Sequence, residues 1–462
     1  MASSARLNFS RVLSVTLIAG FLGTGCAATL PTNKNLAKDA GNSIPNAATT
    51  AAITNTTAAL EKIIGEPLAN SEAQLCGNIA APLSSEEQTY AKVAWQYFIN
   101  NRQSNTGLVN AADSYPSGTL WDMGNYLTAL NASLWLGLVE PADFDQQLST
   151  FLVGLASLPL FEDTLPHKVY NTATGKIVDY GNNPTERGLG WSALDIGRML
   201  AALDIIRTCH PQYSEAIEMA IAHWDLEASI QDGELYGATV GDDDKTQRVQ
   251  EGRLGYEEYA ARGYEKWGYK VPKALSLEPM KSVSLEKVNI SVDTRDYETT
   301  NANNYIVSES YILDGIEFGL PDTLKQEAKR LLSAQENRFK RTGKLTAVSE
   351  DNIDQAPHFL YNTAYANGTD WAVITDQNEA FPELRTLSTK AAFGWRYLFP
   401  DDAYAQQVFD VAKTLQDPDG KGFYAGQYET NGKPNSILTG NTNGLILEIL
   451  YYKARGNQPI LD

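Results

Sequence analysis

The sequence is poor in residues that hold metals and in motifs that mark common nucleophiles. Its 462 residues include only 3 Cys and 4 His, and none of these form a CxxC or HExxH pattern. No GxSxG or Walker motif occurs, and no GxGxxG follows a predicted strand. We therefore expect no metal site and no cofactor, which leaves the acidic side chains as the candidates for chemistry.

Positive charge is scarce as well. The chain has 37 Lys and Arg against 56 Asp and Glu, which gives a formal net charge of -19. Nucleic acids are bound largely through Lys and Arg contacts to phosphates, so we expect no nucleic-acid partner. The same excess of acid disfavours an anionic polysaccharide. Since 10% of the residues are aromatic and suit stacking on sugars, a neutral oligosaccharide or polysaccharide is the expected ligand.

Long apolar runs are missing apart from one near the N-terminus. Residues 12–22 form an apolar run that is too short to span a bilayer permanently. Arg6 and Arg11 precede it and Gly-Thr-Gly-Cys26 follows, which is the order of an export signal. We expect residues 1–26 to be a signal peptide with Cys26 as the lipidated first residue of a bacterial lipoprotein, or with simple cleavage near Ala28. The protein is then periplasmic or anchored to the outer membrane by that lipid alone, and we expect a monomer.

The rest of the chain divides into a tether and one large domain. Residues 27–83 are rich in Ala, Thr and Asn and are typical of a linker that ends in a short helix. No break in composition follows, so residues 84–462 are expected to form a single catalytic domain. In an exported protein Cys76 and Cys209 either pair in a disulfide or remain two unrelated thiols.

Two kinds of helical segment alternate along this domain. Segments of small and apolar residues begin near Leu120, Ser192, Glu251, Tyr305, Thr389 and Thr442, and charged amphipathic segments lie between them. A helix that is apolar all round is buried, and one with a charged face lies outside. The pattern predicts an all-α (α/α)6 toroid of six inner and six outer helices, with long loops on the active-site face. A repeat solenoid is the alternative, but no fixed period is present.

Two clusters of acidic residues lie at the predicted loops. Glu251, Glu257 and Glu258 stand at the start of a helix that is otherwise small and aromatic, where burial would raise a carboxyl pKa as a general acid requires. Residues seven apart share a helix face, which would place Glu251 and Glu258 together. Glu350 and Asp351 lie between two apolar segments and could supply a base. Helix caps and solvated turns are the alternatives for each acid.

Glycosidic bonds are commonly cleaved by one protonated and one ionised carboxyl group, which the two acidic clusters could supply. Other residues near the same loops are expected to contact the sugar rather than to react, or else to serve as caps and core. The predicted substrate-binding residues are Trp121, Asp122, Trp191, Asp195, Glu251, Arg253, Tyr256, Glu257, Glu309, Glu350, Asn352 and Trp371.

Several strings resemble the bacterial domain-of-unknown-function family 3131. They include Gly-Trp191-Ser-Ala-Leu-Asp195-Ile-Gly-Arg198, the run from Glu251 to Gly263, and Leu387-Ser-Thr-Lys390-Ala-Ala-Phe-Gly-Trp395. The resemblance covers roughly residues 90–452. That family is more distantly similar to the (α/α)6 β-1,2-glucanases and to the glucoamylase-like domains, so it implies the same toroid.

The distant resemblance also implies catalytic roles. Gly255-Tyr256-Glu257-Glu258 is similar to a Gly-Trp-Asn-Glu motif whose Glu is the general acid, which implies Glu258. The run from Leu345 to Asn352 is similar to a Leu-Thr-Ala-Ser-Asp-Asn motif with two residues inserted, which implies Asp351 as the base and leaves Glu350 as its competitor. The implied activity is an inverting endo-β-1,2-glucanase. The alternatives are a hydrolase of another neutral exopolysaccharide and a non-catalytic glycan-binding envelope lipoprotein.

Overall fold

The computed structural model describes residues 76–461. The predicted signal peptide, the lipidation site Cys26 and most of the predicted tether therefore lie outside the described residues. Among residues 76–461, no helix combines the length and the apolar character that crossing a bilayer requires.

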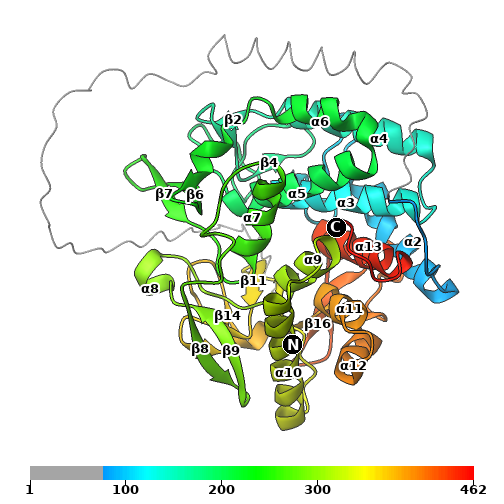
Figure 1. Ribbon diagram of the computed structural model, residues 1–462, viewed down its shortest axis with the longest axis vertical. Helices are drawn as coiled ribbons and strands as arrows, with labels where there is room; N and C mark the ends of the chain where they lie inside the picture. The colour runs from blue at the N-terminus through cyan, green and yellow to red at the C-terminus, as the bar shows by residue number, and fades with distance from the viewer. Residues whose placement is uncertain (1–75, 462) are drawn as a thin grey trace, which may run out of the picture. The chain divides into compact units, whose positions relative to one another are not determined.

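Six helices are buried on nearly every side. They are α3 (Leu120–Trp135), α5 (Ala193–Cys209), α7 (Tyr256–Lys266), α9 (Glu309–Glu317), α11 (Thr389–Leu398) and α13 (Gly440–Ala454). Each packs against the next, and α13 packs against α3, so their contacts follow a closed order (Figure 1). Small residues allow the close approach. A Cβ on Gly197 of α5 would lie 2.6 Å from the Cβ of Ala260 on α7.

Amphipathic helices lie outside these six, as the alternating pattern predicts. They are α2 (Ser85–Asn101), α4 (Pro141–Ala156), α6 (Ser214–Ile221), α10 (Asp322–Thr342) and α12 (Ala403–Ala412). Between α7 and α9 the described chain has instead a hairpin of β8 (Met280–Leu285) and β9 (Val288–Asp293), followed by the one-turn helix α8 (Tyr297–Thr300). The strand β9 packs against α10. The prediction of six outer helices is therefore wrong at this position.

The prediction of an all-α chain is also wrong. Every described strand lies in a segment that leads into one of the six buried helices, and each pairs antiparallel with its neighbour. The connections at the opposite ends of these helices are short, for example residues 318–321 and 399–402. Figure 1 shows β6, β7, β8, β9 and β14 on the left-hand side of the view, with α2, α4 and α12 on the right.

The strands form small sheets of two or three members, β1-β4, β2-β3, β12-β13, β8-β9, β5-β6-β7, β10-β11-β14 and β15-β16-β17. Their bounds are β1 (Ser117–Gly118), β2 (Leu160–Phe161), β3 (Leu165–Pro166), β4 (Tyr170–Asn171), β5 (Ile230–Gln231), β6 (Glu234–Val240), β7 (Thr246–Gln250), β10 (Glu350–Asn352), β11 (Phe359–Asn362), β12 (Tyr365–Ala366), β13 (Thr369–Asp370), β14 (Val373–Ile374), β15 (Thr386–Ser388), β16 (Tyr424–Tyr428) and β17 (Pro434–Leu438). Strands this short carry little alternation of apolar and polar residues, so periodicity does not reveal them.

One arginine joins five of the six buried helices. The fully buried Arg198 of α5 forms an ion pair with Glu317 of α9 and another with Glu448 of α13 at 3.1 Å. Its guanidinium also donates to Asn125 of α3 at 3.0 Å and to the Tyr259 hydroxyl of α7 at 2.6 Å. Buried ion pairs add little net stability, but removing one partner is costly. Arg198 thus fixes how these helices sit relative to one another.

The first described residues, from Cys76 onward, are attached to this domain. Cys76 and Cys209 are joined by a disulfide with their Cα atoms 5.2 Å apart. The carbonyl of Cys76 accepts a hydrogen bond from the Tyr451 hydroxyl at 2.6 Å, and the amide of Ala81 donates to Ala454 at 2.9 Å. Residues 76–83, predicted as the end of the tether, therefore pack against α13.

Candidate active site

The polar groups of the candidate site come from the first turns of the buried helices. Asp122 lies in the first turn of α3, Asp195 in that of α5 and Glu258 in that of α7. Glu309 begins α9, and Lys390 is the second residue of α11. A helix N-terminus favours negative charge, so the carboxylates are well placed there and the lysine is not.

Lys390 is the centre of one buried group of acids. Its ammonium forms an ion pair with Glu309 and lies 3.6 Å from Oδ1 of Asp351. Glu309 also accepts weak hydrogen bonds at 3.4 Å from Ser349 and Asn441. The strand β10, which pairs with β11, brings Asp351 to this position. Residues from α9, β10, α11 and α13 thus meet at one point. We call Lys390, Glu309, Ser349, Asp351 and Asn441 the Lys390 group.

Glu350 and Asp351 differ in their hydrogen bonding and in their pKa. Glu350 accepts a hydrogen bond from the Tyr256 hydroxyl. Burial, with the charge of Glu309 added, raises the pKa of Glu350 well above its usual range. Burial also raises the pKa of Asp351 to about 7, and the charge of Lys390 opposes that rise. Burial and Glu309 therefore favour the protonated form of Glu350, whereas Asp351, which has the cation of Lys390 close by, titrates near neutral pH.

Several buried atoms around Lys390 have no protein partner among the described residues. They are Oε1 of Glu309, Oε2 of Glu350, Oδ2 of Asp351, Oδ1 of Asn441 and Nε1 of Trp121. Buried polar atoms nearly always form hydrogen bonds, if not with protein then with water or a ligand. These carboxylate and amide oxygens can accept hydrogen bonds from the hydroxyl groups of a bound molecule, and the Trp121 indole can donate one.

A second group of acids lies at the start of α5. Glu251 accepts a hydrogen bond from the backbone amide of Ala193 at 2.6 Å and so caps this helix. Burial raises the pKa of Asp195 to about 8, and the charges of Glu251 and Asp122 raise it further. Burial also raises the pKa of Asp122, with Glu309 adding to the rise. Asp122 thus interacts with both groups of acids and links them electrostatically.

Glu257 and Arg253 belong to a separate set of contacts. Glu257 pairs with Arg295 at 2.9 Å and accepts from Gln250 at 2.8 Å. Burial raises the pKa of Glu257 to about 7, and Arg295 opposes the rise. Arg253 donates to Gln250 and to Thr300 of the short helix α8. These contacts hold the chain before α7 and do not involve the Lys390 group.

Glu258 caps its own helix. Its Oε2 accepts a hydrogen bond from the Gly255 amide at 2.6 Å, and burial raises its pKa to about 8, with the charges of Glu257 and Asp293 adding to the rise. Two residues along a helix are 200° apart, so Glu258 and Tyr256 lie on nearly opposite sides of α7. Tyr256 faces Glu350, whereas Glu258 lies toward Tyr311 of α9. The structure therefore places Asp351, but not Glu258, beside Lys390.

The helix α7 starts later than the sequence pattern predicts. Gly252 and Gly255 have φ angles of +88° and +103°, a region in which glycine is favoured. The chain therefore turns twice before α7 begins at Tyr256, and Glu251 precedes the helix. The prediction that Glu251 and Glu258 share a helix face is wrong for this reason.

Aromatic rings connect the Lys390 group to the surface. Trp121 contacts Tyr256 with ring centres 5.4 Å apart, and Tyr256 contacts Tyr305 at 6.0 Å. Tyr305 stacks on Tyr361 at 4.3 Å, and Tyr361 meets Phe359 at 5.4 Å. Phe359 is 39% exposed. Such a row of rings is suited to binding the apolar faces of sugars.

A second exposed ring, Tyr180, lies near the acids at the start of α5. It is 67% exposed, and its backbone carbonyl accepts from the Tyr115 hydroxyl at 3.3 Å. The charges of Asp195 and Glu251 both act on its hydroxyl group. Tyr180 is therefore placed at the edge of the region that holds Asp195.

Three predicted binding residues have contacts of another kind. Trp191 is buried and donates to the Tyr236 carbonyl at 3.1 Å. Trp371 donates to Glu286 at 3.1 Å, and the Arg338 guanidinium lies over its ring at 5.3 Å. The backbone carbonyl of Asn352 accepts from Asn435 at 2.7 Å. These contacts are structural, and none joins the Lys390 group.

The sequence reasoning did not select Lys390, Tyr180, Tyr305, Tyr361 or Asn441. Only Lys390 has a clear sequence signal, because it is a single charge at the start of the apolar segment Thr389-Lys390-Ala-Ala-Phe. The chain has 23 Tyr, so no pattern separates the three tyrosines of the site from those of the core.

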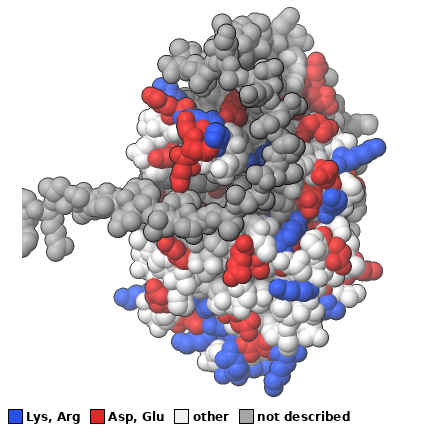
Figure 2. Space-filling model, turned by 90° about the vertical axis from the view of Figure 1, so that its left-hand side faces the viewer, with Lys and Arg blue, Asp and Glu red and all other residues white. Residues whose placement is uncertain are grey.

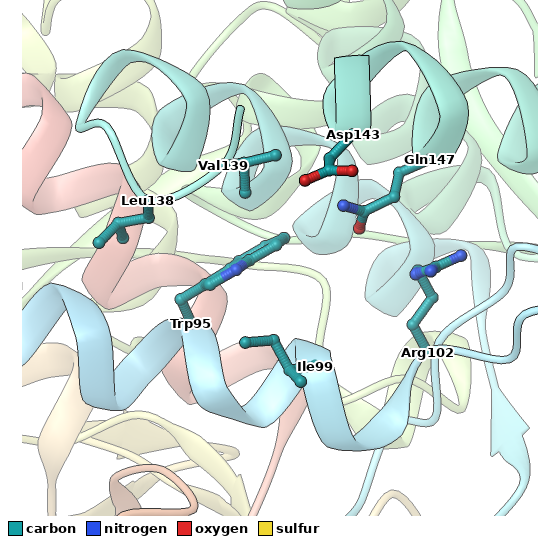
Figure 3. Close-up of a pocket in the computed structure, with 7 residues that line it drawn as sticks. All are labelled: Trp95, Ile99, Arg102, Leu138, Val139, Asp143 and Gln147. Atoms are coloured by element: carbon teal, nitrogen blue, oxygen red, sulfur yellow. The ribbon is translucent and has the colours of Figure 1, made fainter. Parts of the chain in front are cut away.

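A small pocket lies away from these acids. It has a volume of about 260 Å³ and lies between α2 and α4 (Figure 3). Its lining is Trp95, Ile99, Arg102, Leu138, Val139, Asp143 and Gln147. Leu138 follows the C-terminal end of α3, whereas Asp122 lies in the first turn of that helix. The pocket is thus at the opposite end of α3 from the acids.

The charge of the described surface is mixed. Figure 2 shows the side of the molecule that is on the left in Figure 1, where acidic and basic side chains are interspersed. Within residues 76–461, no group of three or more His, Cys, Asp or Glu is arranged to hold a metal ion.

Solved structures with a similar fold include two endo-β-1,2-glucanases. The enzyme from Chitinophaga pinensis, in complex with sophorotriose and glucose, is 14% identical with a TM-score of 0.57, covering 82% of this chain and 96% of its own. The enzyme from Talaromyces funiculosus, in complex with sophorose, is 12% identical with a TM-score of 0.56, covering 80% of this chain and 85% of its own. A candidate glucoamylase from Bacteroides caccae is 13% identical with a TM-score of 0.57, covering 81% and 96%. At such identities the likeness concerns the fold.

Among curated protein sequences none matches this chain. Residues 89–456, by contrast, match the sequence profile of a family described as "Protein of unknown function (DUF3131)". This match extends over most of the chain and over all six buried helices. The protein therefore belongs to the DUF3131 family.

Proposed function

We propose that this protein is an exported glycoside hydrolase that cleaves a neutral glucan, and that β-1,2-glucan is its substrate. We further propose that the domain is an (α/α)6 toroid in which the hairpin β8–β9 takes the place of one outer helix. The closed order of contacts among the six buried helices supports the toroid. The likeness in fold to two endo-β-1,2-glucanases supports the substrate.

One observation carries the proposal of hydrolysis. Several carboxyl groups are buried at the first turns of the helices and on β10, and burial raises the pKa of Glu258 to about 8 and that of Asp351 to about 7. Carboxyl groups whose pKa values lie near neutral pH are suited to general acid and general base catalysis. The adjoining row from Trp121 to Phe359 would hold sugar rings.

The same values support Asp351 as the base. A base must be ionised, and the pKa of Asp351, about 7, permits this near neutral pH. Glu350 is a poor base because burial raises its pKa well above the usual range. Oδ2 of Asp351 accepts no hydrogen bond from the described protein and is free to bind the attacking water.

Two residues are candidates for the general acid. The resemblance implies Glu258, and its pKa of about 8 keeps it protonated at neutral pH. Glu350 is the rival, because burial raises its pKa as well and it directly precedes Asp351 in β10. In an inverting reaction the water oxygen bonds to the anomeric carbon while Asp351 takes the water proton. The glycosidic C–O bond breaks, and the leaving oxygen receives the proton of the acid. Asp122, Asp195 and Glu251 would bind sugar hydroxyls.

The experiment is the release of reducing ends from linear β-1,2-glucan, with laminarin and carboxymethylcellulose alongside. Glu258→Gln, Glu350→Gln and Asp351→Asn are the test variants, and Glu265→Gln on the exposed face of α7 is the control. We expect release from β-1,2-glucan alone, and loss by a factor of about 10²–10⁴ in the acid and base variants. An active Glu258→Gln with an inactive Glu350→Gln would assign the acid to Glu350. Activity on another neutral glucan would correct the substrate.

A second candidate is a glycan-binding protein without catalysis. The observation in its favour is that Glu258 accepts a hydrogen bond from the Gly255 amide and so caps its own helix, a role that needs no catalysis. Titration calorimetry with β-1,2-glucan oligosaccharides would then show binding, while prolonged incubation would release no reducing ends.

We also propose that the chain is exported and anchored by a lipid on Cys26. The disulfide between Cys76 and Cys209 supports export, because such bonds persist in oxidising compartments. Radiolabelled palmitate should enter the wild-type chain and not Cys26→Ser. Labelling of neither would leave a protein that is exported and soluble, or retained in the cell, which fractionation distinguishes.

A further inference from the structure

Lys390 is an unusual lysine. Its side chain is 1% exposed and lies in the first turn of α11, where the helix dipole disfavours positive charge. A buried ammonium group is costly unless it is paired and hydrogen-bonded. A lysine in this place is therefore retained only because other groups compensate for it.

The compensating groups come from every element packed around the ammonium. Asp122 of α3, Glu309 of α9, and Glu350 and Asp351 of β10 interact with it electrostatically, and only Glu309 and Asp351 are close enough for an ion pair. The neutral hydroxyl of Tyr256 lies on Glu350. Four carboxyl groups thus share one cation.

The two partners of Lys390 are held differently. Glu309 forms the ion pair directly and receives two further weak hydrogen bonds, so it anchors the ammonium. The Nζ atom of Lys390 lies 3.6 Å from Oδ1 of Asp351, and this ion pair involves only that oxygen of the carboxylate. Its Oδ2 is buried and forms no hydrogen bond with the described residues, and the Ser388 hydroxyl near this carboxylate also lowers the pKa of Asp351. The lysine therefore stabilises charge on Asp351 and leaves one oxygen of that carboxylate unused.

We propose that Lys390 is a positioning residue that keeps Asp351 ionised and turned so that Oδ2 can receive a proton from the attacking water, with Glu309 as its anchor. This inference rests on the proposed function. During the reaction Lys390 gives up no proton. The water loses a proton to Oδ2 as its oxygen bonds to the anomeric carbon, and the leaving oxygen gains a proton from the acid. In this proposal Glu309 pairs with Lys390 and does not bind a sugar hydroxyl, which differs from the role that the sequence predicts for it.

The test compares Lys390→Met and Lys390→Arg with the wild-type chain, with the exposed Lys92→Met as the control. The readout is kcat/KM for β-1,2-glucan from pH 4 to 9, together with the affinity for an oligosaccharide. In Lys390→Met we expect kcat/KM to fall at least 10-fold at pH 5.5 and the acidic limb of the profile to move up by at least one pH unit, because each unit of pKa lowers the ionised fraction of Asp351 about 10-fold on that limb. Affinity should change less than 3-fold. Lys390→Arg keeps the positive charge, so the acidic limb of its kcat/KM profile should lie close to that of the wild type.

A purely structural role gives a different result. Activity would then fall by the same factor at every pH, with the acidic limb unmoved in both variants, and the proposal would be overturned. A loss of affinity that equals the loss of kcat/KM would overturn it as well, since Lys390 would then bind substrate.

A second measurement separates this proposal from the proposed function. If the wild-type chain cleaves no glucan, the coupling of Lys390 to Asp351 is still visible in denaturant unfolding of Lys390→Met, Asp351→Asn and the double variant. Lys390→Met should be destabilised more at pH 8 than at pH 5, because only at high pH must Asp351 ionise without a cation. In the Asp351→Asn background this pH dependence should shrink. An unchanged pH dependence in that background would refute the coupling whether or not the protein is a hydrolase.

Discussion

Replacing Glu258 by Gln should stabilise the protein at alkaline pH, and it should abolish the proposed activity if Glu258 is the general acid. The side chain is buried, and its pKa is raised from the usual 4.5 to about 8 mainly by burial. The folded state thus binds this proton more tightly than the unfolded chain. Glu258 therefore contributes less to stability as the pH rises from 4.5, and the loss is complete near pH 8.

The size of the effect follows from the shift. One pKa unit corresponds to about 1.36 kcal/mol, so the shift of Glu258 costs the wild-type chain roughly 3 kcal/mol at pH 7 and roughly 5 kcal/mol above pH 8. Gln has no such cost, and its amide oxygen can still accept the hydrogen bond from Gly255. Its amide nitrogen lacks a partner at this site, which costs about 1–3 kcal/mol at any pH. The difference in stability between variant and wild type should therefore rise by about 1.4 kcal/mol per pH unit between pH 4.5 and 8.

The assay is urea unfolding of both chains at half-unit steps from pH 4 to 8.5, followed by tryptophan fluorescence. Glu265→Gln, on the exposed face of the same helix, is the control and should give a flat difference. A flat difference for Glu258→Gln would refute the reasoning, because it would mean that Glu258 is not desolvated and that its carboxyl is not held as an acid at neutral pH.

Three other predictions concern the disulfide, the exposed Tyr180 and the buried Arg198. Replacing Cys76 and Cys209 by Ser opens a loop with a sequence separation of 133 and should lower the free energy of unfolding by roughly 5 kcal/mol, or less if the unfolded chain is structured; an unchanged urea midpoint would contradict it. Tyr180→Ala should raise KM for β-1,2-glucan at least 5-fold with kcat unchanged, as loss of a stacking surface requires, and an unchanged KM would remove Tyr180 from the site. Arg198→Met should cost roughly 3–5 kcal/mol of stability because Glu317 and Glu448 lose their buried cation, and it should cost more at pH 8 than at pH 5; a loss below 1 kcal/mol would contradict its role.

The order of the helices was predictable from the sequence because it depends on local pattern. Apolar residues at 3-4 spacing and small residues at contacts identify α3 and α5 without knowledge of their neighbours. The hairpin β8–β9 was not predictable in the same way. Whether a segment packs on α10 as a strand or a helix is decided by tertiary contacts that its own sequence does not contain.

The site was predictable in composition and less so in geometry. The cluster that contains Glu350 and Asp351 was selected because acids rarely stand between apolar segments, and it lies at the buried lysine. The orientation of Glu258 depends on where α7 begins, and the turns at Gly252 and Gly255 set that start. Lys390 was missed because a lysine is almost always exposed, so its type argues against burial until its partners are known.

The most direct test of the central claim is the release of reducing ends from linear β-1,2-glucan by the purified wild-type chain and by Asp351→Asn at pH 7. We expect release by the wild type from β-1,2-glucan, none from laminarin or carboxymethylcellulose, and a loss of about 10²–10⁴-fold in the variant. Equal release by wild type and variant would contradict the role of Asp351. No release by the wild-type chain, with tight binding of the same glucan, would contradict catalysis and leave a protein that binds glycans.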